Sequence, residues 1–89
     1  MNRDKMREDA LQYIEILSEI GIRSSIDRCS NTIKEKYFET VEVEAGRLYN
    51  PYMKDGILRE LNSELEYEKE QLDMFHLALK LKLGKSELI

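Results

Sequence analysis

Apolar residues recur at helical spacing through the C-terminal half of the chain, between Lys54 and Gly84. Steps of three, four or seven residues separate Leu58, Leu61, Leu65, Leu72, Phe75 and Leu79, which therefore form one stripe along a helix. This spacing predicts a helix over 55–83, and its part from Gly56 to Leu83 would be about 42 Å long at ~1.5 Å per residue. A helix of this length needs packing partners along its length.

The second half of this long helix carries a second apolar stripe beside the first. Steps of seven, three and four separate its members, Tyr67, Met74, Leu77 and Leu81. A helix that is apolar on two sides is covered on two sides. We therefore expect this half to lie between two other helices, or between its own chain and a second subunit, and we predict self-association through these four residues.

The first stripe is interrupted at Glu68, where the repeat calls for an apolar residue. Two interpretations remain open. Glu68 either marks a solvated bend in the helix, or is a polar residue that fixes the register of packing.

The N-terminal residues predict a first helix over 4–20. Its apolar stripe consists of Met6, Ala10, Tyr13, Leu17 and Ile20. Gly21 follows the last turn, where a glycine can take the left-handed conformation that ends a helix. Ile22 then stands where a closing contact with Leu17 is expected. The sequence therefore predicts that the first helix stops at Gly21.

A second helix is predicted over 25–49. Its spaced apolar positions are Ile26, Cys29, Ile33, Tyr37, Val41, Ala45 and Leu48. Residues Thr40–Glu44 alternate as TVEVE, which is a strand pattern, so 37–44 could also be extended. We favour a helix because the run is short and no hairpin turn follows it. Gly46 would weaken this helix by about 1 kcal/mol, and Asn50-Pro51 ends it.

These elements predict an all-α fold in one domain, residues 1–89. With 42% apolar and 36% charged residues, the composition suits a helix-rich protein with a thin core. Short connections predict antiparallel neighbours, so the fold is a three-helix bundle or a long antiparallel helical hairpin with a packed N-terminal helix. Three unequal helices leave one end of the longest uncovered, and we expect a homodimer with two-fold symmetry to cover it.

Composition also limits the classes of function. A net charge of -4 disfavours sequence-independent wrapping of nucleic acid. The single cysteine, Cys29, excludes an internal disulfide and a multi-cysteine zinc site. With no apolar run near the length of a membrane span, and with no secretion signal in view, we expect a cytoplasmic protein that contacts no membrane.

The sequence offers no convincing catalytic or cofactor-binding constellation. Cys29 lies on an apolar stripe, where a thiol behaves as a small hydrophobic group. Asp73 and His76 have the spacing of a metal-ligand pair on a helix, but one pair with a single histidine does not make a di-metal site. The four glycines are isolated and form no phosphate loop. We therefore expect no metal, no cofactor and no enzymatic activity.

Acidic and aromatic residues indicate contacts with another protein. Glu60, Glu64, Glu66 and Glu70 give the long helix an acidic character, which is either an ordinary solvated face or a surface for a basic partner. Tyr49, Tyr52 and Met53 flank the proline, where they would either contact a partner or cap the end of the bundle. The preferred function is a small non-enzymatic protein–protein interaction module, an adaptor or inhibitor that acts through its helical faces.

The alternative is a DNA-binding regulator with a degenerate helix-turn-helix around Gly21–Lys36. Gly21 would supply the turn, and the second helix would present Arg23, Ser24, Ser25 and Arg28 to nucleic acid. The fit has a defect, because the apolar residue expected six positions after the turn glycine is Asp27, and Ile26 comes one position early.

Overall fold

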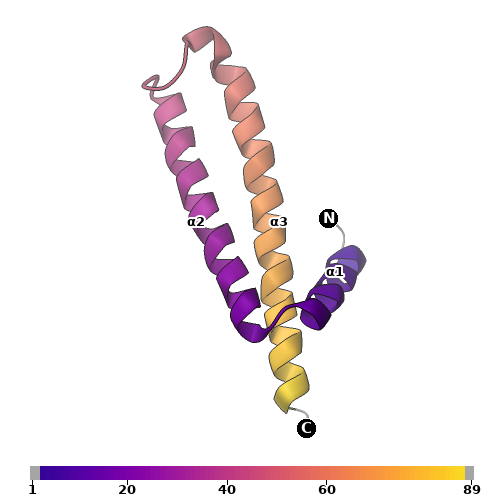
Figure 1. The fold of residues 1–89 in the computed structure, drawn as a ribbon. Coiled ribbons are helices and arrows are strands. Elements are labelled where there is room, and N and C mark those ends of the chain that lie inside the picture. Colours follow the sequence, from indigo (N-terminus) through magenta and orange to yellow (C-terminus); the bar gives the residue numbers. More distant parts are fainter. Residues whose placement is uncertain (1–2, 88–89) are drawn as a thin grey trace.

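The computed structural model describes residues 3–87, with the side chains of 3–84, and within that range it is helical apart from short connections. In chain order the elements are α1 (Arg3–Ile16), α2 (Glu19–Glu44), the 3-10 helix η1 (Pro51–Met53) and α3 (Lys54–Glu87). Helices α2 and α3 form an antiparallel hairpin, and α1 packs obliquely on α3 (Figure 1). The predicted all-α fold, with its hairpin and packed N-terminal helix, is confirmed.

The core lies where all three helices meet, around the C-terminal half of α3. Its buried members are Ala10 and Ile14 of α1, Ile22 and Cys29 of α2, and Met74, Phe75 and Ala78 of α3. The rings of Tyr13 and Phe75 meet edge to face, with their centroids 5.1 Å apart. The sequence left open whether two helices of the chain or a second subunit cover this half of α3, and within the described residues both α1 and α2 pack there.

A lysine of α3 holds the C-terminal end of α1. The Lys82 Nζ donates hydrogen bonds to the carbonyl oxygens of Ile14 at 3.0 Å and Leu17 at 2.7 Å. The last carbonyls of a helix have no partner within that helix and carry partial negative charge. Lys82 supplies both the hydrogen bonds and the positive charge, so it fixes where α1 ends on α3.

The predicted boundary between the first two helices is wrong. Helix α1 ends at Ile16 instead of residue 20, and α2 begins at Glu19 instead of residue 25. Ser18 is the N-cap of α2, and its Oγ accepts a hydrogen bond of 3.1 Å from the Gly21 N–H. Gly21 therefore lies in the first turn of α2. Helix α1 thus ends five residues before Gly21, and Ser18, three residues before Gly21, caps the start of the next helix.

The end of α2 also differs from the prediction. Residues 37–44 are helical, which confirms the helical interpretation of the alternating segment, but α2 ends at Glu44 instead of residue 49. Gly46 has a φ of 76°, the Gly46 N–H donates to the Val43 carbonyl at 3.1 Å, and the Arg47 N–H donates to the Glu42 carbonyl at 3.0 Å. This is a Schellman motif, in which the left-handed glycine ends the helix. Gly84, in contrast, was predicted to end α3, and α3 continues past it to Glu87.

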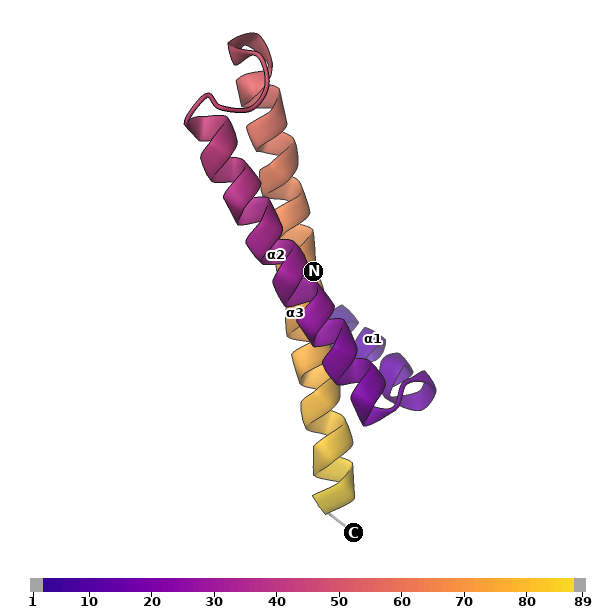
Figure 2. The same cartoon turned by 60° about the vertical axis from the view of Figure 1, so that its left-hand side comes forward.

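The molecule is elongated because α1 is short. Its extents are 57 × 24 × 16 Å and its radius of gyration is 16.6 Å, against about 12 Å for a compact chain of this length. Beyond α1 the hairpin continues as two helices (Figure 1), with Val43, Leu61 and Leu65 buried between them. Figure 2 shows that α2 crosses α3 obliquely along the hairpin. We call this two-helix part, residues 32–66, the distal arm.

The two misassigned glycines provide a direct test of the boundaries. We expect Gly21→Ala to raise the free energy of unfolding by about 0.5–1 kcal/mol, because alanine has less conformational entropy to lose than glycine. A methyl group at Gly21 would meet Ser18 Oγ and Leu17 Cβ at 3.5 and 3.6 Å, which are ordinary contacts.

Gly46→Ala should have the opposite effect and lower the free energy of unfolding by about 1 kcal/mol, since the left-handed backbone penalises any Cβ. No other group lies within 4 Å of that Cβ, so the cost is purely conformational. Urea denaturation followed by circular dichroism measures both. Destabilisation by Gly21→Ala would mean that α1 stops at Gly21 after all.

Candidate functional site

A groove of about 390 Å³ runs between α2 and α3 in the distal arm. Its lining residues come from both helices and the loop between them: Lys36, Glu39, Tyr49, Met53, Ile57, Glu60, Leu61 and Glu64. The apolar side chains among them are Met53, Ile57 and Leu61. The carboxylates outnumber the one ammonium by three to one, so the groove is acidic.

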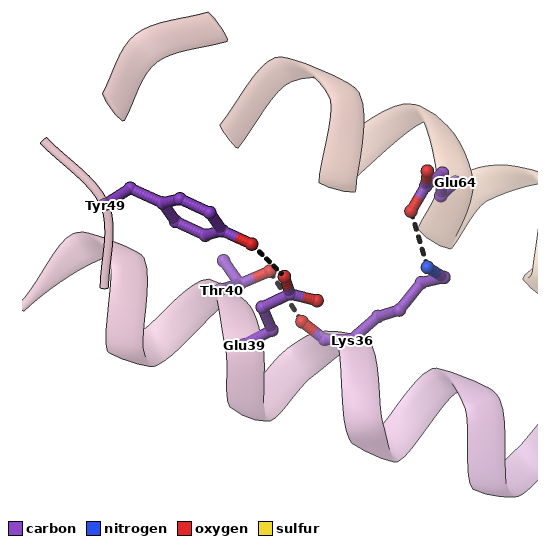
Figure 3. Close-up of polar contacts among 5 residues, drawn as sticks. All are labelled: Lys36, Glu39, Thr40, Tyr49 and Glu64. Carbon is purple, nitrogen blue, oxygen red and sulfur yellow. Dashed lines mark hydrogen bonds and ion pairs between the residues drawn. The ribbon is translucent and has the colours of Figure 1, made fainter. Parts of the chain in front are cut away.

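An ion pair bridges the groove. The Lys36 Nζ lies 2.5 Å from the Glu64 Oε2 (Figure 3). The hydrogen bond to Glu64 raises the pKa of Lys36 above its usual value, with the charges of Glu64, Glu39 and Glu68 acting in the same direction. Both side chains are partly exposed, so the pair adds little to stability, at most about 1 kcal/mol. Its main consequence is geometric, because it fixes the spacing of the two helices.

The loop after α2 is folded back onto this groove through Tyr49. Tyr49 has a φ of 68°, a left-handed conformation that costs a non-glycine residue about 1 kcal/mol or more. Its hydroxyl donates a 3.2 Å hydrogen bond to Glu39 Oε1 (Figure 3). That hydrogen bond is the main reason why the pKa of Tyr49 is raised, and the charges of Glu39 and Glu60 add to it. The strained loop therefore places an aromatic ring at the rim of the groove.

The structure groups the predicted acidic residues differently from the sequence analysis. Glu60 and Glu64 line the groove together with Glu39 from α2. Glu66 is exposed and follows Glu64 by two positions. Two positions correspond to about 200° of helical rotation, so Glu66 lies on another side of α3. Glu70 lies six residues after Glu64, about 240° away, and is half-buried. The four glutamates thus do not form one face.

The groove also contains residues that the sequence analysis did not select. Lys36 and Glu39 both line it. They are three positions apart, a spacing that puts them on the same side of a helix. Tyr49 was selected with Tyr52 and Met53 as a residue beside the proline, but its contact with Glu39 was not predicted, because that contact depends on the left-handed backbone and the end of α2 at Glu44.

The predicted self-association residues lie mostly inside the chain. Met74 is 1% exposed in the core. Leu77 and Leu81 are half-buried and pack against the same core. Only Tyr67 is largely exposed, at 59%. Three of the four residues thus already pack within the chain. Self-association through these four residues stays a prediction, and it would require the core around Met74 to open.

The residues predicted to contact nucleic acid lie in the first turns of α2. Arg23, Ser24 and Arg28 are exposed, and Ser25 is half-buried. Ser25 Oγ donates to the Gly21 carbonyl at 3.0 Å, and Arg23 Nε lies 3.8 Å from Glu19.

The predicted helix-turn-helix is wrong at its turn. Gly21 is inside α2, so no turn occurs there. Arg23 and Arg28 are five residues apart, about 140° around the helix, and Lys36 is engaged with Glu64. The basic side chains therefore do not gather on one face, and DNA binding stays a prediction from the sequence alone.

Glu68, which interrupts the first stripe, lies beside the cysteine. Burial raises the pKa of the Cys29 thiol, and the neighbouring Glu68 carboxylate raises it further. Glu68 is half-buried within a continuous α3, which favours a register-fixing polar residue over a solvated bend. Both residues line a second groove of about 330 Å³, together with Tyr13, Thr32 and Gln71 among others. A raised pKa leaves little thiolate, so Cys29 is a poor nucleophile.

No metal site or membrane span is found in the part of the chain that the structure describes. Asp73 and His76 are both exposed. Within residues 3–87 no group of three or more His, Cys, Asp or Glu side chains is placed to hold a metal ion. No helix in that range combines the length and apolar character needed to cross a membrane.

Comparison of the chain with protein-family models, with curated proteins and with solved structures finds no match. Its function is therefore inferred from the grooves and exposed faces of the molecule.

The contact between Tyr49 and Glu39 predicts a pH dependence. Because the pKa of Tyr49 is raised in the folded protein, its contact stabilises the fold at pH values below the unfolded-state pKa. This stabilisation is lost as the pH rises through the folded-state pKa. Phenolate absorbance of the wild type minus that of Tyr49→Phe gives the titration of Tyr49, with a midpoint expected above 10. Glu39→Gln should lower that midpoint. An unchanged midpoint in Glu39→Gln would show that the loop does not rest on Glu39 in solution.

The environment of Cys29 predicts slow alkylation. Native protein should react with iodoacetamide much more slowly than urea-unfolded protein, because the thiol is buried and its pKa is raised. Glu68→Gln should increase the native rate by lowering that pKa. Glu66→Gln, on another side of the same helix, is the control and should leave the rate unchanged. Equal rates for wild type and Glu68→Gln would contradict the contact between Cys29 and Glu68.

Proposed function

We propose that the chain is a small non-enzymatic protein–protein interaction module, an adaptor or inhibitor that docks through its distal arm. The observation that carries this proposal is the acidic groove of the arm, which none of the helices described covers. The groove is lined by three apolar side chains and three carboxylates, a combination that suits an amphipathic helix with basic residues beside its apolar stripe.

The arrangement of the second groove supports a helical occupant. Thr32 and Lys36 are one turn apart in α2, and Glu64 and Glu68 are one turn apart in α3. The groove beside Tyr13 of α1 and the arm groove therefore follow one another on the same side of the hairpin. Helix α1 lies on this side near the core, and a partner helix in the arm would continue the three-helix packing.

The lengths of the helices set the size of the partner. The distal arm contains residues 32–44 of α2 and 54–66 of α3, which are 13 residues of each helix. These segments are about 20 Å long and have no third helix beside them. A partner helix of about 13 residues spans this length, so a peptide of about 20 residues covers it with a turn to spare at each end.

Aromatic and apolar side chains at the tip of the arm extend the same surface. Tyr52 is 97% exposed, Met53 56% and Tyr49 53%. The sequence left open whether these residues cap the bundle or contact a partner, and their exposure supports the second interpretation. Large exposed tyrosines and methionines are enriched at protein interfaces.

A designed peptide tests the chemistry of the groove. The probe is a fluorescent helical peptide of about 20 residues, with leucines on one stripe and lysines on both flanks, and binding is measured by fluorescence anisotropy. Glu60→Lys should weaken binding about tenfold by placing a positive charge against the lysines. Added salt should also weaken wild-type binding.

Glu66→Lys is the matched control. It makes the same change in net charge on an exposed position of the same helix, but on another side from the groove. We expect it to bind nearly as well as wild type. Equal losses in the two variants, or failure of the wild type to bind the peptide, would contradict docking in the arm groove.

A further inference from the structure

A second exposed apolar surface lies on α2, on the side opposite the groove. Phe38 is 68% exposed, Val41 54% and Tyr37 45%. Phe38 is two residues after Lys36, about 200° around the helix, and therefore faces away from the groove. Phe38 and Val41 are neighbours at i and i+3, and Tyr37 and Val41 at i and i+4, so the three form one patch. We call Tyr37, Phe38 and Val41 the outer patch of α2.

The surroundings of this patch are partly fixed within the chain. The Lys69 ammonium lies 5.0 Å from the centroid of the Tyr37 ring, a cation–π contact across from α3. Phe38 and Val41 belong neither to the core around Met74 nor to the side chains packed against it. An apolar patch of three adjacent large side chains on a narrow two-helix arm is typical of an interaction surface.

We propose that a second copy of this chain covers the outer patch, with the two α2 helices antiparallel across a two-fold axis near Phe38. The two arms would then form a four-helix bundle. This contact differs from the one predicted through Tyr67, Met74, Leu77 and Leu81, and it requires no displacement of α1.

The charges of α2 favour a second copy in this orientation. Around a two-fold axis at Phe38, residues 32–37 of one copy lie opposite residues 39–44 of the other. Residues 32–37 carry Lys34, Lys36 and Glu35, a net charge of +1.

Residues 39–44 carry Glu39, Glu42 and Glu44, a net charge of −3, and Arg47 beyond the helix end compensates Glu42, to which it donates at 2.6 and 2.9 Å. An antiparallel pair therefore places segments of opposite net charge next to each other, whereas a parallel pair places the two acidic segments together.

The accessible area is compatible with such a dimer. The chain exposes 6639 Å², against about 5,400 Å² for a typical monomer of its mass. The surplus of roughly 1,200 Å² is spread along the elongated chain and compares with the ~800 Å² that each partner buries in a standard interface. A second copy on the outer patch would remove part of this surplus from water and leave the arm groove open on the other side.

Light scattering after size exclusion tests the dimer. We expect the wild type to have twice the chain mass of 10.5 kDa at high concentration, and Phe38→Glu to have the mass of one chain. Ile20→Glu is the matched control, because Ile20 is 76% exposed near the start of the same helix, away from the patch, and it should remain a dimer. Circular dichroism checks that both variants keep their helices. A monomeric wild type, or a dimer that survives Phe38→Glu, overturns the proposal.

Disulfide cross-linking tests the orientation. With Cys29→Ser as the background, Phe38→Cys should form a disulfide-linked dimer rapidly on mild oxidation, because the two-fold axis brings both copies of residue 38 together. Tyr52→Cys should not, because the tips of antiparallel arms point in opposite directions. Efficient cross-linking at residue 52 with none at 38 overturns the antiparallel arrangement. Both readouts are independent of peptide binding in the groove, so this dimer and the proposed function can fail separately.

Discussion

The packing of the C-terminal half of α3 between two helices is the constraint on which the rest of the structure depends. Met74, Phe75 and Ala78 are buried in the core with residues of α1 and α2, and the Phe75 ring meets that of Tyr13 in α1. Lys82 adds a polar anchor where α1 ends. Since α1 has only 14 residues, this core occupies one end of the molecule. The remaining length of the hairpin is consequently a two-helix arm with a thin core, and both candidate interaction surfaces lie on it.

A two-helix arm has two ways to lower its exposed apolar area, and they are compatible here. The groove side carries carboxylates and an ion pair, which would repel the same acidic groove of a second copy. The outer patch has apolar side chains with helix charges that reverse along α2. Electrostatics therefore favours the two proposals together: a basic partner in the groove and a second copy of the chain on the outer patch. The two proposed occupants would not compete, because the surfaces lie about 200° apart around α2.

The sequence predicted the helices well and their ends poorly, for physical reasons. Periodicity reports which face of a helix is buried, so the double stripe ending at Leu81 indicated packing on two sides of α3 but did not decide between α1 and a second subunit. A helix end depends on competition between caps. Ser18 with its bond to the Gly21 amide ended α1 before Gly21 could act, and Gly46 took the left-handed conformation that had been assigned to Gly21. Glycine alone does not distinguish a helix stop from a tolerated position in a first turn.

The candidate site was harder to predict from the sequence than the helices, because it is built from residues on three elements. Glu60 and Glu64 were selected as acidic, but their partners across the groove depend on the hairpin register, which the apolar stripes fix only to within a turn. The position of the Tyr49 ring depends on two further features, the end of α2 at Glu44 and the left-handed backbone at Tyr49. Only with both does its hydroxyl reach Glu39. Strain of this kind persists when surrounding contacts compensate for it. The exposed hydrogen bond between Tyr49 and Glu39 offsets only part of the backbone strain at Tyr49. A partner that packs on the Tyr49 ring would bind more tightly for this arrangement, because the loop is already folded onto the groove and need not be ordered on binding.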